Sequence, residues 1–251
     1  MMRRLLVINP NTSASVTALL HQHVTATAGP EVQVQAVTAR FGAPYIACEA
    51  SYAVAGHATL DAWAAALAGR AADAQPDAVL IGCFGDPGLL ALRESSPVPV
   101  TGLAEGAFAA AARHGRFAIV TGGERWRPML QRLADALGYG TRLAGIYTVA
   151  PTGAELAADP LHARSLLRQA CRHAAEQFRA DSVVLGGAGL AGIAAAIQAG
   201  VEVPVIDSVV AGARHALALR VDAVPRKPGF SVPWSGVSPE MTDLGTPPAT
   251  P

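Results

Sequence analysis

The sequence of 251 residues has no apolar run of the roughly 18 residues that a membrane-spanning helix needs, although 51% of its residues are hydrophobic. Neither sign of charge is in excess, because 19 Lys and Arg balance 19 Asp and Glu. This balance argues against nucleic acid or an anionic membrane surface as a partner. There are only three cysteines (Cys48, Cys83 and Cys171) and no Cys-x-x-Cys spacing, which argues against a disulfide framework or a zinc site. A cysteine that matters here should matter as a thiol.

The start of the chain, MMRRLLVINPN, has two arginines before an apolar run, as a signal peptide does. That run, LLVI, is far shorter than the roughly 7–15 residues of a signal-peptide core. We therefore expect a buried first strand and a cytoplasmic protein.

Segments typical of strands alternate along the chain with segments typical of helices. The strand candidates include RRLLVINPN, EVQVQAVTA, PDAVLIGCFGD, RFAIVTGG and TRLAGIYTVA. Thr12 or Ser13 can cap the helix that follows the first of them. The alternation predicts an α/β fold class with parallel sheets flanked by helices. From about Pro225 onward the chain is dense in Pro, Gly and Ser, so we expect a tail without a core of its own and disorder in its last ten residues.

Two stretches of the sequence resemble each other at an offset of about 104 residues. DAVLIGCFGDPGLLAL begins at Asp77 and DSVVLGGAGLAGIAAA at Asp181, and each is followed by Val-Pro-Val and a helix rich in small residues. Two copies are too few for a solenoid, so we predict two similar α/β halves. Ligands of open α/β units bind at the carboxyl ends of the strands. If the halves face each other, four strand-end loops meet in one cleft: 9–12, 83–86, 121–123 and 187–189.

The second copy also spells the fingerprint Gly187-x-Gly189-x-x-Gly192, with Asp207 where a dinucleotide-binding protein has its ribose-binding acid. Only one more strand and one helix follow, and the first copy, GCFGDPG, lacks the pattern. NAD or FAD binding is therefore the less favoured interpretation. Glycines that let the turn pass close to its neighbours are favoured, and their N–H groups would also form an anion cradle. We expect Asp207 to cap the next helix.

Cys83 directly follows the apolar segment AVLIG and precedes a helix. A thiol at a helix N-terminus has its pKa lowered and favours the thiolate, whereas the alternative is a buried small hydrophobe. Position alone leaves both open. We expect Cys171 in the core, and Cys48 packed in a loop or at a helix start.

Three segments, taken in order, resemble the hydantoin racemase branch of the aspartate/glutamate racemase superfamily: LLVINPNTSASVT, IGCFGDPGLLALRE and VLGGAGLAGIAAAIQAGVEVPVIDSV. TGLAEGAF, FAIVTGGERW and ACRHA also fit, and the resemblance runs from about residue 3 to 230. It implies two pseudo-symmetric subdomains, 1–102 plus 206–230 and 103–205, followed by the Pro/Gly-rich tail 231–251. It also implies an active site in the cleft between the subdomains and no cofactor.

Proteins of that superfamily use two cysteines on opposite faces of the substrate, one thiolate removing a proton beside a carbonyl while the other thiol returns one. Cys83 matches the first, and Gly187 stands where the family pattern LGCAGM has the second. Loss of such an acid or base typically costs about 10²–10⁴-fold in rate, unless a water, a mobile side chain or a relocated Cys48 takes over. Strand-end loops hold the substrate's carboxylate or ring carbonyl, which implies a cradle made of Asn11, Thr12, Phe84, Gly85, Thr121, Gly122, Ala188 and Gly189.

The resemblance therefore implies a cofactor-independent isomerase of racemase type, without a metal, that acts by thiol proton transfer. Its substrate would be a small amino-acid derivative, hydantoin or carboxylate. The missing second cysteine keeps two alternatives open: a single-cysteine decarboxylase of arylmalonate type, and a homologue that binds a small acid without turning it over. The superfamily is commonly oligomeric, so a homo-oligomer is a further expectation, although no segment of the sequence marks an interface.

Overall fold

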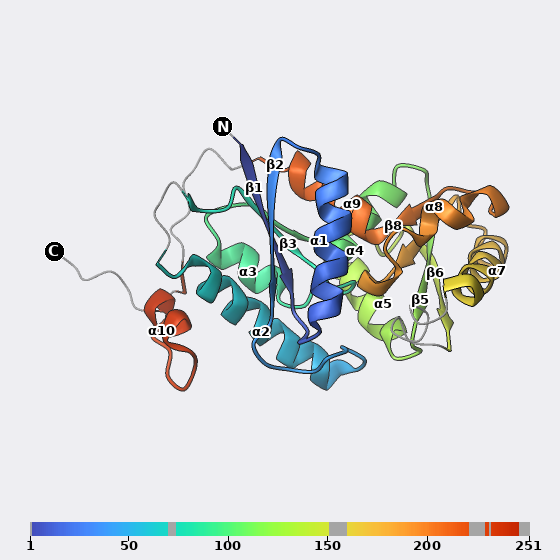
Figure 1. Cartoon of the computed structure of the whole chain (residues 1–251). Helices are drawn as coiled ribbons and strands as arrows, with labels where there is room; N and C mark the ends of the chain where they lie inside the picture. The colour runs from blue at the N-terminus through green and yellow to red at the C-terminus, as the bar shows by residue number, and fades with distance from the viewer. Residues whose placement is uncertain (1, 70–73, 151–159, 221–228, 231, 246–251) are drawn as a thin grey trace.

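Two four-stranded parallel sheets organise the chain in the computed structural model, which describes residues 2–69, 74–150, 160–220, 229–230 and 232–245 (Figure 1). The first sheet has the order β2-β1-β3-β4 and consists of β1 (Arg3–Asn9), β2 (Val32–Thr38), β3 (Ala78–Ile81) and β4 (Val100–Gly102). The second has the order β6-β5-β7-β8 and consists of β5 (Phe117–Gly122), β6 (Leu143–Val149), β7 (Ser182–Gly186) and β8 (Val205–Asp207). The predicted α/β fold with two parallel sheets is confirmed.

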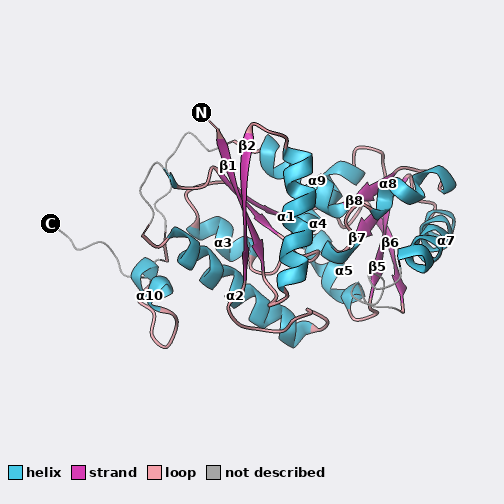
Figure 2. Cartoon of the chain, viewed as in Figure 1, coloured by secondary structure: helices cyan, strands magenta, loops and turns pink. Residues whose placement is uncertain are grey.

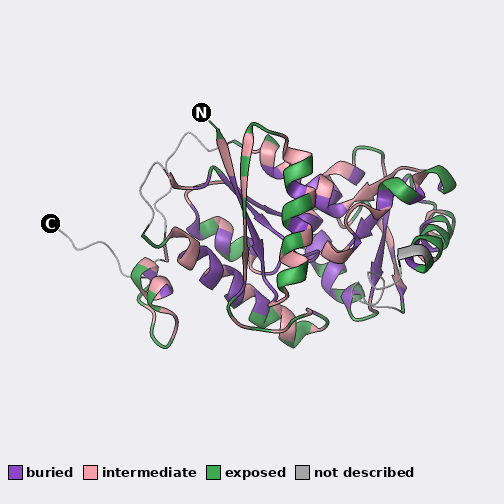
Figure 3. Ribbon diagram, in the orientation of Figure 1, coloured by how far each residue is buried: buried purple, intermediate pink, exposed green. Residues whose placement is uncertain are grey.

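The inner strands are buried on both faces, which is why they read as continuous apolar runs (Figure 3). The two Val-Pro-Val segments contribute strands that begin only at Val100 and Val205, because a proline has no N–H to donate to a sheet. Each proline still takes part through its carbonyl. The oxygen of Pro99 accepts from the N–H of Val79, and that of Pro204 from the N–H of Val183, both at 2.9 Å.

Helices flank both sheets (Figure 2). They are α1 (Ala14–Ala28), α2 (Glu49–Leu67), α3 (Leu89–Ser95), α4 (Leu103–Ala111), α5 (Trp126–Ala136), α7 (Pro160–Phe178), α8 (Ile193–Ile197) and α9 (Ser208–Ala218), with short 3₁₀ turns η2 (Ala188–Leu190) and η3 (Gln198–Gly200). Ser13 is the N-cap of α1, one of the two predicted caps, and its side chain accepts from the N–H of Val16. In the described part of the chain, no helix combines the length and apolar character needed to cross a membrane.

The two halves are joined by an exchange of helices. Helix α4 follows β4 of the first sheet but packs on β7 of the second, while α9 follows β8 of the second sheet but packs on β3 and β4 of the first. The two helices also pack on each other. At Gly106 in α4 a Cβ would lie 2.6 Å from the Cα of Gly212 in α9, so this crossing needs glycine. The subdomain boundaries at 102/103 and 205/206 stay a prediction with which these contacts agree.

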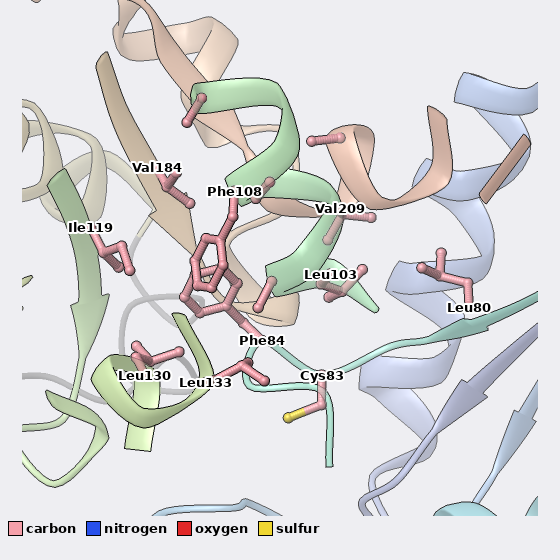
Figure 4. Close-up of a cluster of buried hydrophobic side chains, with 14 of the residues drawn as sticks. Leu80, Cys83, Phe84, Leu103, Phe108, Ile119, Leu130, Leu133, Val184 and Val209 are labelled. Atoms are coloured by element: carbon pink, nitrogen blue, oxygen red, sulfur yellow. The ribbon is translucent and has the colours of Figure 1, made fainter. Parts of the chain in front are cut away.

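A cluster of buried hydrophobic side chains from both halves, with phenylalanine rings among them, lies between the sheets (Figure 4). Phe108 of α4 lies at its centre, with ring centroids 6.1 Å from Phe84 and 5.4 Å from Phe117. Figure 4 shows Phe84 pointing into the cluster and the sulfur of Cys83 pointing away from it. Burying one such side chain contributes about 1.5–3 kcal/mol. The cluster therefore anchors the loop after β3 between the two halves.

The C-terminal segment contains a helix that sequence analysis missed, α10 (Pro239–Gly245), which packs against α2. Its Met241 is fully buried, and Phe230 lies edge-on to Trp63 with centroids 6.2 Å apart. The expected disorder of the last ten residues is wrong for 242–245, which belong to α10, while 246–251 lie outside the described residues. A helix of seven residues among prolines and glycines is too short to produce a clear hydrophobic period.

Candidate active site

A cavity of about 390 Å³ lies where the carboxyl ends of β1, β3, β5 and β7 meet. Strand-end loops of both halves and the first turns of α1 contribute to its wall. This is where open α/β units bind ligands.

Eight of the ten residues predicted for the site line this one cavity: Asn11, Cys83, Phe84, Thr121, Gly122, Gly187, Ala188 and Gly189. The other two, Thr12 and Gly85, do not line it. The N–H of Thr12 donates to the carbonyl of Ala43 at 3.1 Å, which turns this residue toward the loop after β2. Gly85 is covered by Trp126, since a Cβ at Gly85 would lie 2.4 Å from the indole ring.

Sequence reasoning missed a second group of lining residues, namely Ser13, Ser15, Val16, Leu19, Pro44, Tyr45, Ile46, Gly82, Trp126, Gly186 and Leu190. The loop after β2, which supplies Tyr45 and Ile46, also leaves the carboxyl end of a strand. The rule that selected the other four loops would therefore have found it.

Cys83 is 8% exposed and lies at the edge of the cavity. Burial raises the pKa of its thiol above the ordinary value, and the negative charge of Asp86 raises it further. The predicted lowering by a helix N-terminus is therefore wrong. Helix α3 begins only at Leu89, six residues further on, and it has seven residues. The positive N-terminal end of the α3 dipole is therefore separated from the Cys83 thiol by the residues of the loop between them.

Asp86, three residues after Cys83, is a buried carboxylate that links the loop to the first turn of α4. Its oxygens accept from the N–H groups of Ala104 and Glu105 at 2.9 and 2.8 Å. Its own N–H donates to the carbonyl of Cys83 at 3.1 Å. Burial raises the pKa of Asp86 to about 7, although the two N–H groups pull it down.

Gly187, opposite in the pseudo-symmetric half, adopts a φ of 147°, in the region that favours glycine. Its N–H donates to the hydroxyl of Ser208 at 3.2 Å. A Cβ at this position would lie 3.3 Å from the Cγ of Leu190. A side chain at position 187 therefore needs a local shift of the backbone.

The dinucleotide-like pattern has a structural explanation. Asp207 is the N-cap of α9, as predicted, and its Oδ1 accepts from the N–H groups of Val209 and Val210. Its Oδ2 accepts from the N–H of Gly192 at 2.7 Å. Asp207, which occupies the ribose-binding position of the fingerprint, therefore binds the backbone of the glycine-rich loop.

The other two cysteines are accounted for by structure. Cys171 lies in α7 and is buried in the core, as predicted. Cys48 is the N-cap of α2, with its sulfur 3.5 Å from the hydroxyl of Ser51. This hydrogen bond lowers the pKa of the Cys48 thiol. Cys48 does not line the cavity, so the structure does not support it as a relocated second thiol.

The cavity has little charge of its own. Among its described lining residues there is no Asp, Glu, Lys, Arg or His, and the ionisable side chains are Cys83 and Tyr45. Ser13, Ser15 and Val16 bring the N-terminus of the 15-residue helix α1 to the wall, and a helix N-terminus carries a partial positive charge. Nowhere in the described ranges do three or more His, Cys, Asp or Glu gather in a way that could hold a metal ion.

Two parallel sheets, a cavity of about 390 Å³ at their strand ends and a thiol in its wall define a two-part α/β fold with a pocket of small-molecule size. The chain belongs to the Asp/Glu/hydantoin racemase family, whose model matches residues 5–216. It is accordingly a racemase-type enzyme, an isomerase.

The chain is 32% identical to the hydantoin racemase of Pseudomonas sp. (strain NS671) over 211 residues, which cover 84% of this chain and 83% of the relative. It is 34% identical to the hydantoin racemase of Paenarthrobacter aurescens over 221 residues, 86% of this chain and 90% of that protein. Among solved structures, the allantoin racemase from Klebsiella pneumoniae superposes with a TM-score of 0.81 at 30% identity, covering 97% of this chain and 99% of that one.

Proposed function

We propose that this protein is a cofactor-independent isomerase that transfers a proton at an acidic carbon of a hydantoin-type cyclic ureide, with Cys83 as its acid/base group. The observation that carries the proposal is the position of Cys83, an ionisable thiol at a strand end, in the wall of a cavity lined by both halves. Two relatives named hydantoin racemase, matched over most of their length, support the choice of substrate class.

The uncharged wall favours a neutral ring over a free amino acid or a dicarboxylate. A charged group held in such a cavity without a countercharge loses its hydration and gains no ion pair, which is costly. A ring carbonyl needs only hydrogen-bond donors. Asn11 is suited to this, because its Oδ1 already accepts from Asn9 and from the N–H of Ser13, which leaves Nδ2 to donate to a ligand.

The proton transfer would create negative charge on the carbonyl oxygen next to the carbon that loses its proton. The N-terminus of α1 and the loop N–H groups would stabilise this enolate-like oxygen without a metal or a charged side chain. A thiolate whose pKa is raised is the stronger base, which suits a weakly acidic C–H, although less of it is ionised at neutral pH. As a thiol, Cys83 would return the proton to the same face.

Gly187 supplies no side chain that can carry a proton on the opposite face. We therefore expect exchange of the substrate proton with solvent to be faster than inversion. The same observation favours one second candidate, a decarboxylase of arylmalonate type, in which a single thiol protonates one face of an enediolate. A homologue that only binds small acids is the remaining alternative.

The test is incubation in D₂O with a panel of 5-substituted hydantoins, amino acids and arylmalonates, followed by NMR and chiral chromatography. We expect deuterium at the acidic carbon of a hydantoin, and a rate about 10²–10⁴-fold lower in Cys83→Ala. Cys48→Ala is the matched control and should keep the parent rate, because Cys48 lies outside the cavity wall. Release of CO₂ from a malonate would establish the decarboxylase instead. Binding without deuterium exchange or CO₂ release across the panel would refute catalysis.

A further inference from the structure

A carboxylate holds the strand-end loop in each half, but its position in the chain differs: it is Asp86 in the half that carries Cys83 and Asp207 in the other. The two halves match closely here, since Gly88 and Gly192 are the N-caps of α3 and α8 with φ of 82° and 81°. In the second half the carboxylate belongs to the N-cap of α9, Asp207, and reaches back to the loop at Gly192. In the first half it belongs to the loop, as Asp86, and reaches forward to α4.

The N-cap of α4 is accordingly Gly102, and its missing side chain makes room for the displaced carboxylate. A Cβ at Gly102 would lie 2.1 Å from the Cγ of Asp86. Asp86 itself is 1% exposed and has a φ of 51°, in the left-handed region that few residues other than glycine, asparagine and aspartate adopt. A helix cap alone does not need this arrangement, because Asp207 caps α9 from an ordinary position.

What the arrangement adds is a buried carboxyl group in the loop of Cys83, three residues from the thiol, that is ionised in the alkaline range where a thiol titrates. We propose that Asp86 is the positioning residue of Cys83: it clamps the Cys83–Gly88 turn to the N-terminus of α4 and keeps its carboxylate within the loop that carries the thiol. This rests on Cys83 being the proton-transfer group, as proposed above. The clamp fixes the turn at both ends, since the N–H of Asp86 donates to the carbonyl of Cys83 and the carbonyl of Asp86 accepts from Leu89.

Three other titratable groups face this turn. Tyr52 of α2 donates its hydroxyl to the carbonyl of Gly85 at 2.7 Å, and Glu105 of α4 donates its backbone N–H to Asp86 at 2.8 Å. Arg132 of α5 lines the same groove as Asp86. Arg132 is paired with Glu49 at 2.7 Å. The positive charge of Arg132 is thus offset by Glu49, and Asp86 is the charged group that acts on the Cys83 thiol.

The test measures the pH dependence of Cys83 alkylation by iodoacetamide, read peptide by peptide by mass spectrometry, so it requires no substrate and no turnover. In Asp86→Asn we expect the alkylation midpoint of Cys83 to fall by about one pH unit, because a negative charge nearby disfavours the thiolate and its removal lowers the pKa. Asp207→Asn is the matched control. It removes the equivalent carboxylate from the other half and should leave the Cys83 midpoint unchanged. An unshifted midpoint in Asp86→Asn, or an equal shift in both variants, would overturn the proposal.

The parent protein provides a second measurement that does not depend on the folding of a variant. The same experiment reports Cys48, which has a neutral hydrogen-bond donor beside it, Ser51, instead of a carboxylate. We expect the midpoint of Cys83 to lie above that of Cys48. A Cys83 midpoint at or below that of Cys48 would refute a charge beside the thiol, whether or not the protein proves to be a racemase.

Discussion

Replacing Gly187 by cysteine tests whether the second half of the cavity lacks only a proton carrier. Position 187 lines the same cavity as Cys83, and the family resemblance predicts that the second thiol would stand there. The substitution Gly187→Cys adds that thiol but also adds a Cβ at a φ of 147° and 3.3 Å from Leu190. The chemical and the conformational effects must therefore be separated.

Gly187→Ala separates them, because it carries the same Cβ and no thiol. A side chain held at such a φ costs about 1–3 kcal/mol, and the contact with Leu190 requires a shift of a few tenths of an ångström. We expect both variants to lose about 1–3 kcal/mol of unfolding free energy relative to the parent in urea titrations. The difference in activity between them then reports the thiol alone.

The assay follows loss of optical activity of a single hydantoin enantiomer and, in D₂O, deuterium uptake by NMR. Since one acid or base group contributes about 10²–10⁴-fold, we expect Gly187→Cys to racemise at least about 10²-fold faster than Gly187→Ala. The rate of deuterium uptake should differ less between the two variants than the rate of racemisation, because on the proposed mechanism Cys83 exchanges the substrate proton in both. Equal racemisation by the two variants, with both folded, would show that a missing thiol at 187 is not what limits inversion.

Three further substitutions test contacts that stabilise the fold. Arg40→Ala should lower the unfolding free energy in urea by about 2 kcal/mol, because the carboxylate of Asp61, which is 3% exposed, loses its partner. The 44% exposure of Arg40 keeps this loss below that of a fully buried pair. Glu240→Gln removes the outer partner of Arg40 and should change the unfolding free energy by no more than about 0.5 kcal/mol. Burial alone would raise the pKa of Asp61, but the hydrogen bonds from Arg40 outweigh it and hold the pKa below its ordinary value, so this stability is present above about pH 4 and lost as the pH falls further; an acid limb identical in parent and Arg40→Ala would contradict this. Gly186→Ala should lower the unfolding free energy by about 1–3 kcal/mol and reduce activity, because the new Cβ would lie 2.2 Å from the ring of Phe84. An unchanged melting temperature would show instead that the ring is free to move.

The fold and most of the cavity could be predicted from the sequence because they depend on period and order. Apolar runs such as AVLIG and RFAIV specify buried strands, and their order along the chain specifies which strand ends meet. The repeat near Asp77 and Asp181 fixed the correspondence between halves, which brought Cys83 and Gly187 to one cavity.

What the sequence could not provide were properties set by contacts between distant segments. The pKa of Cys83 depends on burial among residues of both halves, so the local rule about helix N-termini predicted the wrong sign. Gly85 follows Phe84 directly, yet Trp126, about 40 residues later, removes it from the cavity wall. The packing of α10 depends on a few isolated side chains such as Met241, and these do not form a hydrophobic periodicity that could be recognised in the sequence.

The two faces of the cavity differ in more than the presence of one sulfur. Cys83 lies beside a buried carboxylate in its own loop, whereas the corresponding carboxylate of the second half, Asp207, binds the N–H of Gly192, five residues beyond Gly187. Gly187 instead gives its N–H to Ser208. A thiol introduced at position 187 would therefore lack a neighbouring negative charge and should ionise at a lower pH than Cys83. On the proposed mechanism the stronger base stands on the Cys83 side, so adding a thiol at position 187 would create an unequal pair.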